Sequence, residues 1–166
     1  MTTLDDLKDT LWLYTTHEQH PFQVDEAHAA LGDSGDLVVD ALIWGLGQDD
    51  VDMKLLVLQL LQHHYTDAER ALPAVRSLVS DEENRLVRVT ALNTANVMGD
   101  TSAALIPLLS PRLESQDSFE RLIAAANLWR LCRSEDAYVV LRREATGEDY
   151  DPAVMMARSY LRDTEA

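Results

Sequence analysis

Cysteine is nearly absent from this sequence: Cys132 is the only one in 166 residues, so no internal disulfide can form. Long apolar runs are absent as well. None approaches the roughly 20 residues that a membrane-spanning helix needs, so we expect no membrane partner. Residues 1–9 lack the cationic start of a signal peptide, which predicts a cytoplasmic protein. With 46% hydrophobic residues, the chain is expected to form a single domain, residues 1–166.

Motifs of catalysis are also missing. The sequence contains no glycine-rich phosphate loop, no His-Glu-x-x-His pair and no Gly-x-Ser-x-Gly turn. His17 and His20 stand three residues apart, but no cysteine is near them and no carboxylate lies at a diagnostic spacing for zinc. Paired acids such as Asp49-Asp50 stand at expected helix starts, where the helix dipole explains them. We therefore predict no catalytic residues, no cofactor, no metal and no enzymatic activity.

Positive charge is scarce and unevenly distributed. The chain has 14 lysines and arginines against 29 acids, a net charge of -15. Residues 1–69 hold 14 of the acids but only two lysines, whereas every arginine lies in residues 70–166. Such an acidic surface repels the phosphates of nucleic acids and attracts a protein with a basic surface. The alternative is a solvated acidic surface that only keeps the protein soluble.

One apolar pattern recurs along the chain with a period of 33 or 34 residues. We call the residue that marks each copy of the pattern its anchor. The positions two before and four after each anchor are also apolar, apart from His28. Gly32-Asp33 and Gly99-Asp100 match across two periods. The anchors are Val24, Val57, Ala91, Ala124 and Ala157. A fixed period of this length is typical of stacked helical repeats, and the alternative is five unrelated amphipathic helices of similar spacing.

Second helices are expected between the anchored ones. Pro73 and Pro107 lie 34 residues apart, and proline is tolerated in the first turn of a helix, where its missing N–H has no partner to lose. Each unit is therefore predicted to be a helical hairpin that buries its apolar face against its neighbours. The expected elements are a cap helix at about 3–16, repeats at about 21–48, 51–81, 84–115 and 118–148, and a half repeat at 151–164.

The repeats resemble the HEAT-like family, in the short form known from bilin-lyase-type proteins. The resemblance covers about residues 21 to 164. It rests chiefly on Val87-Arg88, Ala91, Ala95, Gly99-Asp100, Ile106-Pro107 and Leu109, and on Arg121 with Ala124 and Leu128. It implies an all-α fold, a right-handed α-solenoid of about five stacked hairpins with the second helices on its concave surface. The longer HEAT form has a period of about 40 to 47 residues, and the signature residues of tetratricopeptide and ankyrin repeats are absent.

The segment Leu37–Gly47 has only one charged residue, Asp40. A helix that is apolar all round is either buried or exposes an apolar face that can bind another molecule. We predict an apolar patch around Trp44, ringed by acids, that binds a protein partner. The alternative is that Trp44 packs against Trp12 and the N-terminal cap helix. The predicted partner-binding residues are Asp36, Asp40, Ile43, Trp44, Asp49 and Asp50.

Three further expectations follow from the repeat frame. His28 stands in an apolar column and is expected to be partly buried and hydrogen-bonded. Cys132 occupies the column of Gly32 and Gly99, which favours a packed small residue over a reactive thiol. Lys54, Arg88 and Arg121 recur in register, and the resemblance implies that they bridge acids of adjacent units.

Together these features predict a non-enzymatic protein-binding scaffold. Small size, acidity and the aromatic patch favour a bacterial immunity protein or antitoxin that neutralises a basic toxin, and arginine in preference to lysine is typical of a GC-rich bacterial source. Two alternatives stay open. One is a HEAT-like enzyme or enzyme subunit, with cofactor handling like that of the bilin lyases, and the other is a regulatory or assembly module of a larger complex.

Overall fold

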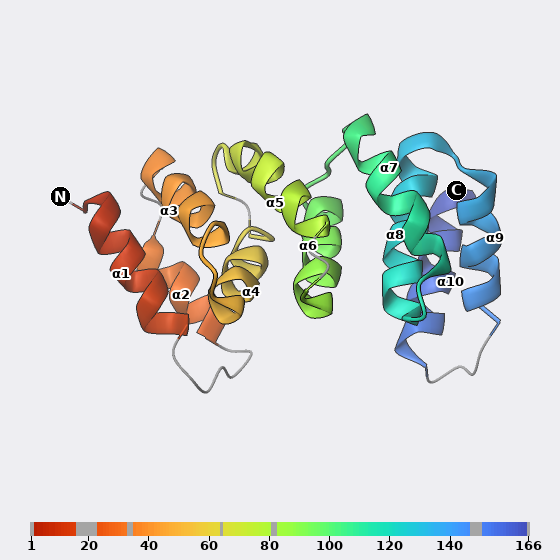
Figure 1. The fold of residues 1–166 in the computed structure, drawn as a ribbon, viewed down its shortest axis with the longest axis horizontal. Helices are drawn as coiled ribbons and strands as arrows, with labels where there is room; N and C mark the ends of the chain where they lie inside the picture. Colours follow the sequence, from red (N-terminus) through yellow and green to blue (C-terminus); the bar gives the residue numbers. More distant parts are fainter. Residues whose placement is uncertain are drawn as a thin grey trace. The chain divides into compact units, whose positions relative to one another are not determined.

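The computed structural model describes residues 2–15, 23–32, 35–63, 65–80, 83–146 and 151–165. Within these ranges every regular element is a helix (Figure 1), which confirms the all-α class. The helices form two compact units, residues 1–100 and residues 101–166, and each unit is described by itself.

Unit 1 contains six α-helices and one short 3-10 helix among the described residues. In chain order they are α1 (Leu4–Thr15), α2 (Gln23–Leu31), α3 (Asp36–Leu46), α4 (Val51–Leu60), η1 (Ala68–Ala71), α5 (Leu72–Val79) and α6 (Arg85–Val97). The start of helix α1 is capped, because the Thr3 hydroxyl accepts a hydrogen bond from Asp6 N (3.2 Å) while the Asp6 carboxylate accepts one from Thr3 N (2.8 Å). Leu7 and Leu11 are fully buried along one stripe of the helix.

The apolar helix α3 lies in the core of unit 1, against α1 and α4. Val39 and Leu42 on this helix are completely buried. Gly45 allows the close approach: a Cβ atom at this position would lie 2.7 Å from Cγ2 of Val57 on α4 and 3.6 Å from Cδ1 of Leu11 on α1. Because this contact leaves no room for a methyl group, the glycine fixes how near α3 and α4 can lie.

The Gly99-Asp100 turn ends unit 1. Gly99 has a φ of 70°, in the left-handed region that suits glycine at the end of a helix. The next residue, Asp100, has a side chain only 1% exposed and a two-pronged ion pair with Arg76 of α5, at 2.7 and 2.8 Å. This hydrogen bond raises the pKa of Arg76 above its ordinary value. The turn therefore attaches the end of the unit to α5.

Unit 2 is built around the long helix α8, which packs against both α9 and α10. An unbroken run from Leu122 to Leu128 is buried in α8. The elements of this unit are η2 (Ala103–Leu105), α7 (Ile106–Leu109), η3 (Ser110–Glu114), α8 (Ser118–Cys132), α9 (Glu135–Glu144) and α10 (Pro152–Glu165).

Proline determines the local form of two predicted second helices. Pro73 lies in the first turn of α5 and Pro107 in the first turn of α7, as expected. The segment after α6 is not one continuous helix, however, because α7 has only four residues between two 3-10 turns. Pro111 lies in the first turn of η3 and cannot donate a backbone hydrogen bond there. The boundary between the units also falls between α6 and α7, inside the expected repeat 84–115.

The end of α8 corrects the expectation for Cys132. The cysteine is exposed rather than packed, and its Sγ lies 3.3 Å from the carbonyl oxygen of Leu128. The left-handed residue that ends this helix is Arg133, with a φ of 54°, one position after the column of Gly32 and Gly99. The helix is therefore one residue longer than the repeat frame predicts, and Cys132 is its last residue.

Arg121 corrects a second expectation. Its guanidinium binds Glu144 of α9 at 2.9 and 3.1 Å and donates to the carbonyl oxygen of Ser115 at 2.7 Å. Arg121 and Glu144 belong to the same predicted repeat, so the prediction that Arg121 bridges an acid of an adjacent repeat is wrong. A weaker ion pair between Arg112 and Glu120, at 3.7 Å, does join neighbouring predicted repeats.

Candidate functional site

Two tryptophans meet on the surface of unit 1. Trp12 on α1 is 39% exposed, and Trp44 on α3 is partly exposed. Their ring centroids lie 6.3 Å apart with the planes at 78°, an edge-to-face contact. We call the surface formed by Lys8, Trp12, Leu37, Asp40 and Trp44 the tryptophan surface.

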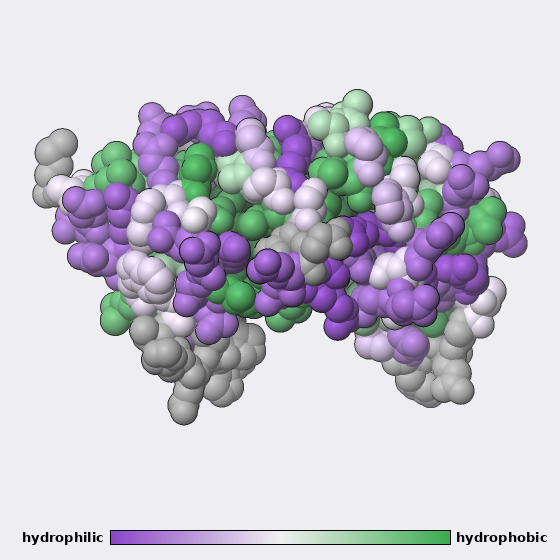
Figure 2. Space-filling model, viewed as in Figure 1, coloured by the Kyte–Doolittle hydropathy of each residue, from purple (hydrophilic) through white to green (hydrophobic). Residues whose placement is uncertain are grey.

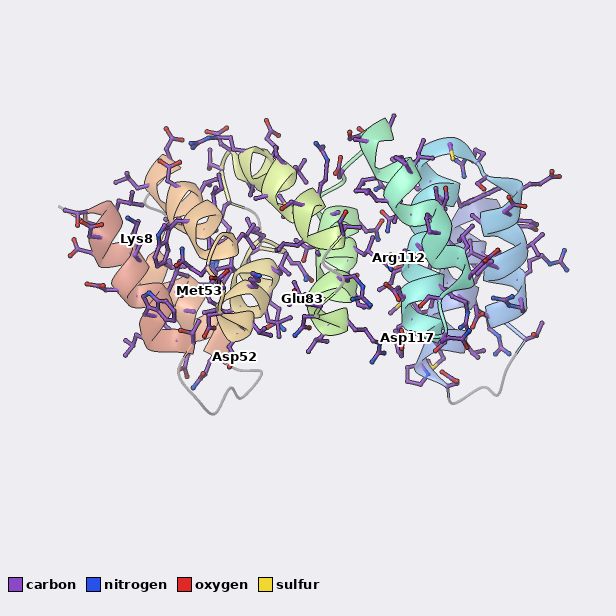
Figure 3. All side chains as sticks on the ribbon, viewed as in Figure 1. Lys8, Asp52, Met53, Glu83, Arg112 and Asp117 are labelled. Atoms are coloured by element: carbon purple, nitrogen blue, oxygen red, sulfur yellow. The ribbon has the colours of Figure 1, made fainter. Side chains whose placement is uncertain are left out.

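The rest of this surface comes from residues on the same faces of the two helices. Leu37, Asp40 and Trp44 recur at steps of three and four along α3, so they share one face. Lys8 precedes Trp12 by one turn of α1 and places its Nζ 5.4 Å from the centre of the Trp44 ring. Figure 3 labels Lys8 on α1, beside α3. The two helices thus present aromatic, aliphatic and charged groups side by side.

Acidic side chains lie around the tryptophan surface, and two cations pair with three of them. Arg70 of η1 binds the Asp40 carboxylate, and its guanidinium is 3.9 Å from Asp36. Lys8 pairs with Asp5 at 3.2 Å. All of these side chains are at least one-quarter exposed, so each pair contributes little to stability. The pairs hold the carboxylates in place and leave them accessible to a partner.

The structure places the six predicted partner-binding residues in two groups. Asp36, Asp40, Ile43 and Trp44 all lie on α3, and the last two are partly exposed. Asp49 and Asp50 are exposed just before α4, where the Asp50 carboxylate accepts a hydrogen bond of 2.7 Å from Met53 N and caps that helix. Asp50 therefore has a structural role of its own, and partner binding by the six residues stays a prediction.

Sequence reasoning left Lys8 and Arg70 out of the site and gave Trp12 only as the alternative packing partner of Trp44. A sequence signal for Trp12 exists: it follows Leu11 directly and so lies just outside the apolar stripe of α1. No such signal exists for Arg70, because it reaches Asp40 across 30 positions of the chain.

A second polar cluster confirms the expectation for His28. This histidine is partly buried, and its Nδ1 lies 2.6 Å from the hydroxyl of Tyr65. Its ring stacks on His63, with centroids 4.4 Å apart and planes at 16°. Burial raises the pKa of Tyr65 above its ordinary value, so the phenol is neutral at physiological pH.

A pocket of about 270 Å³ lies beside this cluster. Its walls include His63, Tyr65, Gln62, Asp67 and the backbone of Gly99. No group of three or more metal-binding side chains comes together anywhere in the part of the chain that the structure describes. Its lining offers side-chain and backbone groups that can form hydrogen bonds with a small polar molecule.

The surface as a whole is mixed. On the face that Figure 2 shows, hydrophilic residues are widespread over each unit and are interrupted by separate hydrophobic areas. Across the described ranges, no helix combines the length and the apolar character that a membrane crossing requires.

No protein-family model matches the sequence, and a search of curated proteins finds no match either.

Proposed function

We propose that the chain is a HEAT-like helical-repeat scaffold that binds a protein partner, and that the tryptophan surface of unit 1 docks a basic region of that partner. The observation that supports this most directly is the edge-to-face pair of Trp12 and Trp44, because both rings are partly exposed. Asp40 and Asp36 lie one and two turns before Trp44 on α3. Tryptophan is among the residues most enriched at the energetic centres of interfaces.

The contacts within the surface reduce the cost of binding. Each indole is held by the other, and Lys8 lies over the Trp44 ring. Arg70 restrains Asp40 in the same way. Because these side chains are already ordered, they lose less conformational entropy when a partner immobilises them. The tryptophan surface is thus preorganised for binding.

The charge of unit 1 favours a cationic partner. Residues 1–100 contain 18 acids against six lysines and arginines, so most of the net charge of -15 belongs to this unit. A field of this sign accelerates the approach of a positively charged protein and repels nucleic acid. Within this class of function, an immunity protein or antitoxin that covers a basic toxin fits the charge best.

The proposal is tested with the full chain as bait and the captured protein then purified. Titration calorimetry would compare the wild type with Trp44→Ala, and Leu86→Ala provides a matched control because Leu86 is 59% exposed on α6, outside the tryptophan surface. We expect Trp44→Ala to weaken binding about 30-fold, as for an interface residue worth about 2 kcal/mol. The control should stay within about twofold of the wild type.

Salt supplies the second arm of the test. The affinity of the wild-type chain for its partner should fall when the salt concentration rises from about 50 to about 300 mM. The Debye length shortens over this range, so the attraction between opposite charges is screened. Tight binding that changes neither with salt nor with Trp44→Ala would refute the proposal. If the captured protein is a toxin, loss of its activity in the complex would support the inhibitor form of the proposal.

A further inference from the structure

A row of two aromatic rings and two arginines crosses the surface of unit 2. The rings of Trp129 on α8 and Tyr138 on α9 lie 5.0 Å apart with planes at 33°. The guanidinium carbon of Arg133 is 5.2 Å from the centre of the Trp129 ring, and that of Arg142 is 5.9 Å from the centre of the Tyr138 ring. We call these four residues the arginine–aromatic row.

Helix geometry produces this row. Arg133 follows Trp129 by four residues at the end of α8, and Arg142 follows Tyr138 by four residues in α9, so each arginine lies one turn from its ring. The packing of α8 against α9 then brings the two rings together. The row has an arginine at each end and an aromatic pair in the middle.

Both arginines of the row are exposed. Neither has an ion pair with any residue that the structure describes, whereas Arg121 and Arg143 in the same unit both bind Glu144. A guanidinium that lies over a ring keeps its N–H groups free at the edge, where it can bind a carboxylate with two parallel hydrogen bonds. The row therefore offers two oriented sites for anions on one surface.

The dimensions of the row suit a short extended peptide. The three contacts limit the distance between the two guanidinium carbons to at most about 16 Å, so an extended chain of no more than about five residues covers it. The two rings between them provide an apolar floor. A peptide with two acids separated by apolar residues matches this order of groups.

We propose that the arginine–aromatic row binds an acidic segment of another protein, with one carboxylate on Arg133, one on Arg142 and an apolar side chain on the rings between them. Two free guanidinium groups are too few for nucleic acid, whose binding depends on neutralising many phosphates. The net charge of -15 also repels a long polyanion more strongly than a peptide with two carboxylates. This site goes beyond the tryptophan surface, because it lies in the other unit and selects the opposite charge.

The test uses the full chain and a fluorescent peptide of about nine residues, with blocked ends and two glutamates four positions apart around two leucines. Fluorescence anisotropy would compare the wild type with Arg133→Gln/Arg142→Gln and with Arg133→Lys/Arg142→Lys. The control Arg162→Gln removes one exposed positive charge from α10, outside the row. Circular dichroism would show that each variant keeps its helices.

The glutamine pair should weaken peptide binding at least tenfold, and the lysine pair about threefold or more, because lysine keeps the charge but loses the two parallel hydrogen bonds and the planar contact. Arg162→Gln should change the affinity by less than twofold. Equal affinity of the lysine pair and the wild type would overturn the proposal. So would tighter binding of a single-stranded oligonucleotide than of the peptide, or self-association of the chain that the glutamine pair abolishes. Failure of the Trp44→Ala test would leave this site unaffected, since the two tests alter different units.

Discussion

Gly45 is the residue where a single methyl group should have the clearest effect on unit 1. It lies on α3 next to Trp44, where α3 contacts Val57 and Met53 of α4. Gly45→Ala places a Cβ atom 2.7 Å from Cγ2 of Val57 and 3.3 Å from Sδ of Met53. The methionine is flexible and can move away, but valine is branched at Cβ and has few rotamers. The valine contact therefore decides the result.

Two opposing effects determine the size of the change. Alanine favours the helical backbone over glycine by about 1 kcal/mol. Forcing an extra methyl group into a packed core costs about 1 to 3 kcal/mol, and Val57 is completely buried. An ordinary carbon contact needs the two helices to separate by about 0.7 Å, which also disturbs their other contacts. We expect a net loss of about 0 to 2 kcal/mol in the free energy of unfolding of unit 1.

Urea unfolding followed by tryptophan fluorescence would measure this loss. Trp129→Phe provides a suitable background, because Trp12 and Trp44 then report on unit 1 alone. The buried Nε1 of Trp129 has no hydrogen-bond partner among the described residues, so phenylalanine should be tolerated there. In a double-mutant cycle, Gly45→Ala should become neutral or stabilising once Val57→Ala has removed the contact, a coupling of about 2 kcal/mol. A stabilising effect of Gly45→Ala with Val57 intact would refute the reasoning.

Three further outcomes are expected in the same type of experiment. Asp100→Ala should destabilise unit 1 by about 2 to 4 kcal/mol, because it leaves the Arg76 guanidinium without its carboxylate; a loss below about 1 kcal/mol in urea unfolding would contradict this. Gly99→Ala should cost about 1 kcal/mol from backbone strain alone, since no atom lies within 4 Å of the added Cβ. Burial alone would raise the pKa of Glu144, but hydrogen bonds from Arg121 and Arg143 outweigh it and lower the pKa below its ordinary value of 4.5. The stabilisation by Glu144 is therefore present above about pH 4.5 and lost as pH falls further, so the stability difference between wild type and Glu144→Gln should shrink in acid.

Much of the helical content could be predicted from the sequence, because amphipathic spacing and the first-turn prolines act locally. Pro73 and Pro107 both begin helices as expected. The prediction was wrong at the end of α8, where the repeat frame differs from the structure by one residue. The repeat frame placed Cys132 with two glycines, but α8 continues through it and the left-handed turn is at Arg133.

The candidate site was harder to predict because its geometry depends on contacts between distant segments. The sequence indicated that α3 has an unusual face, and the structure adds that Trp44 meets Trp12 across 32 positions of the chain. The cation that pairs with Asp40 comes from η1, which contacts both α3 and α5, so the pair depends on how these segments pack rather than on local pattern. Gly45 is similar, since only the packed structure shows that Val57 excludes a side chain there.

The ion pair of Arg76 and Asp100 determines where the chain can be cut to isolate unit 1 intact. Asp100 is the last residue of unit 1, so both partners of the pair belong to one side of the boundary. A fragment cut after Asp100 keeps the pair, whereas a fragment that is one residue shorter leaves a guanidinium with no carboxylate in a partly buried position. Proteolytic or genetic separation of the two halves should therefore be planned at Thr101, because a cut a single position earlier would damage the part it is meant to isolate.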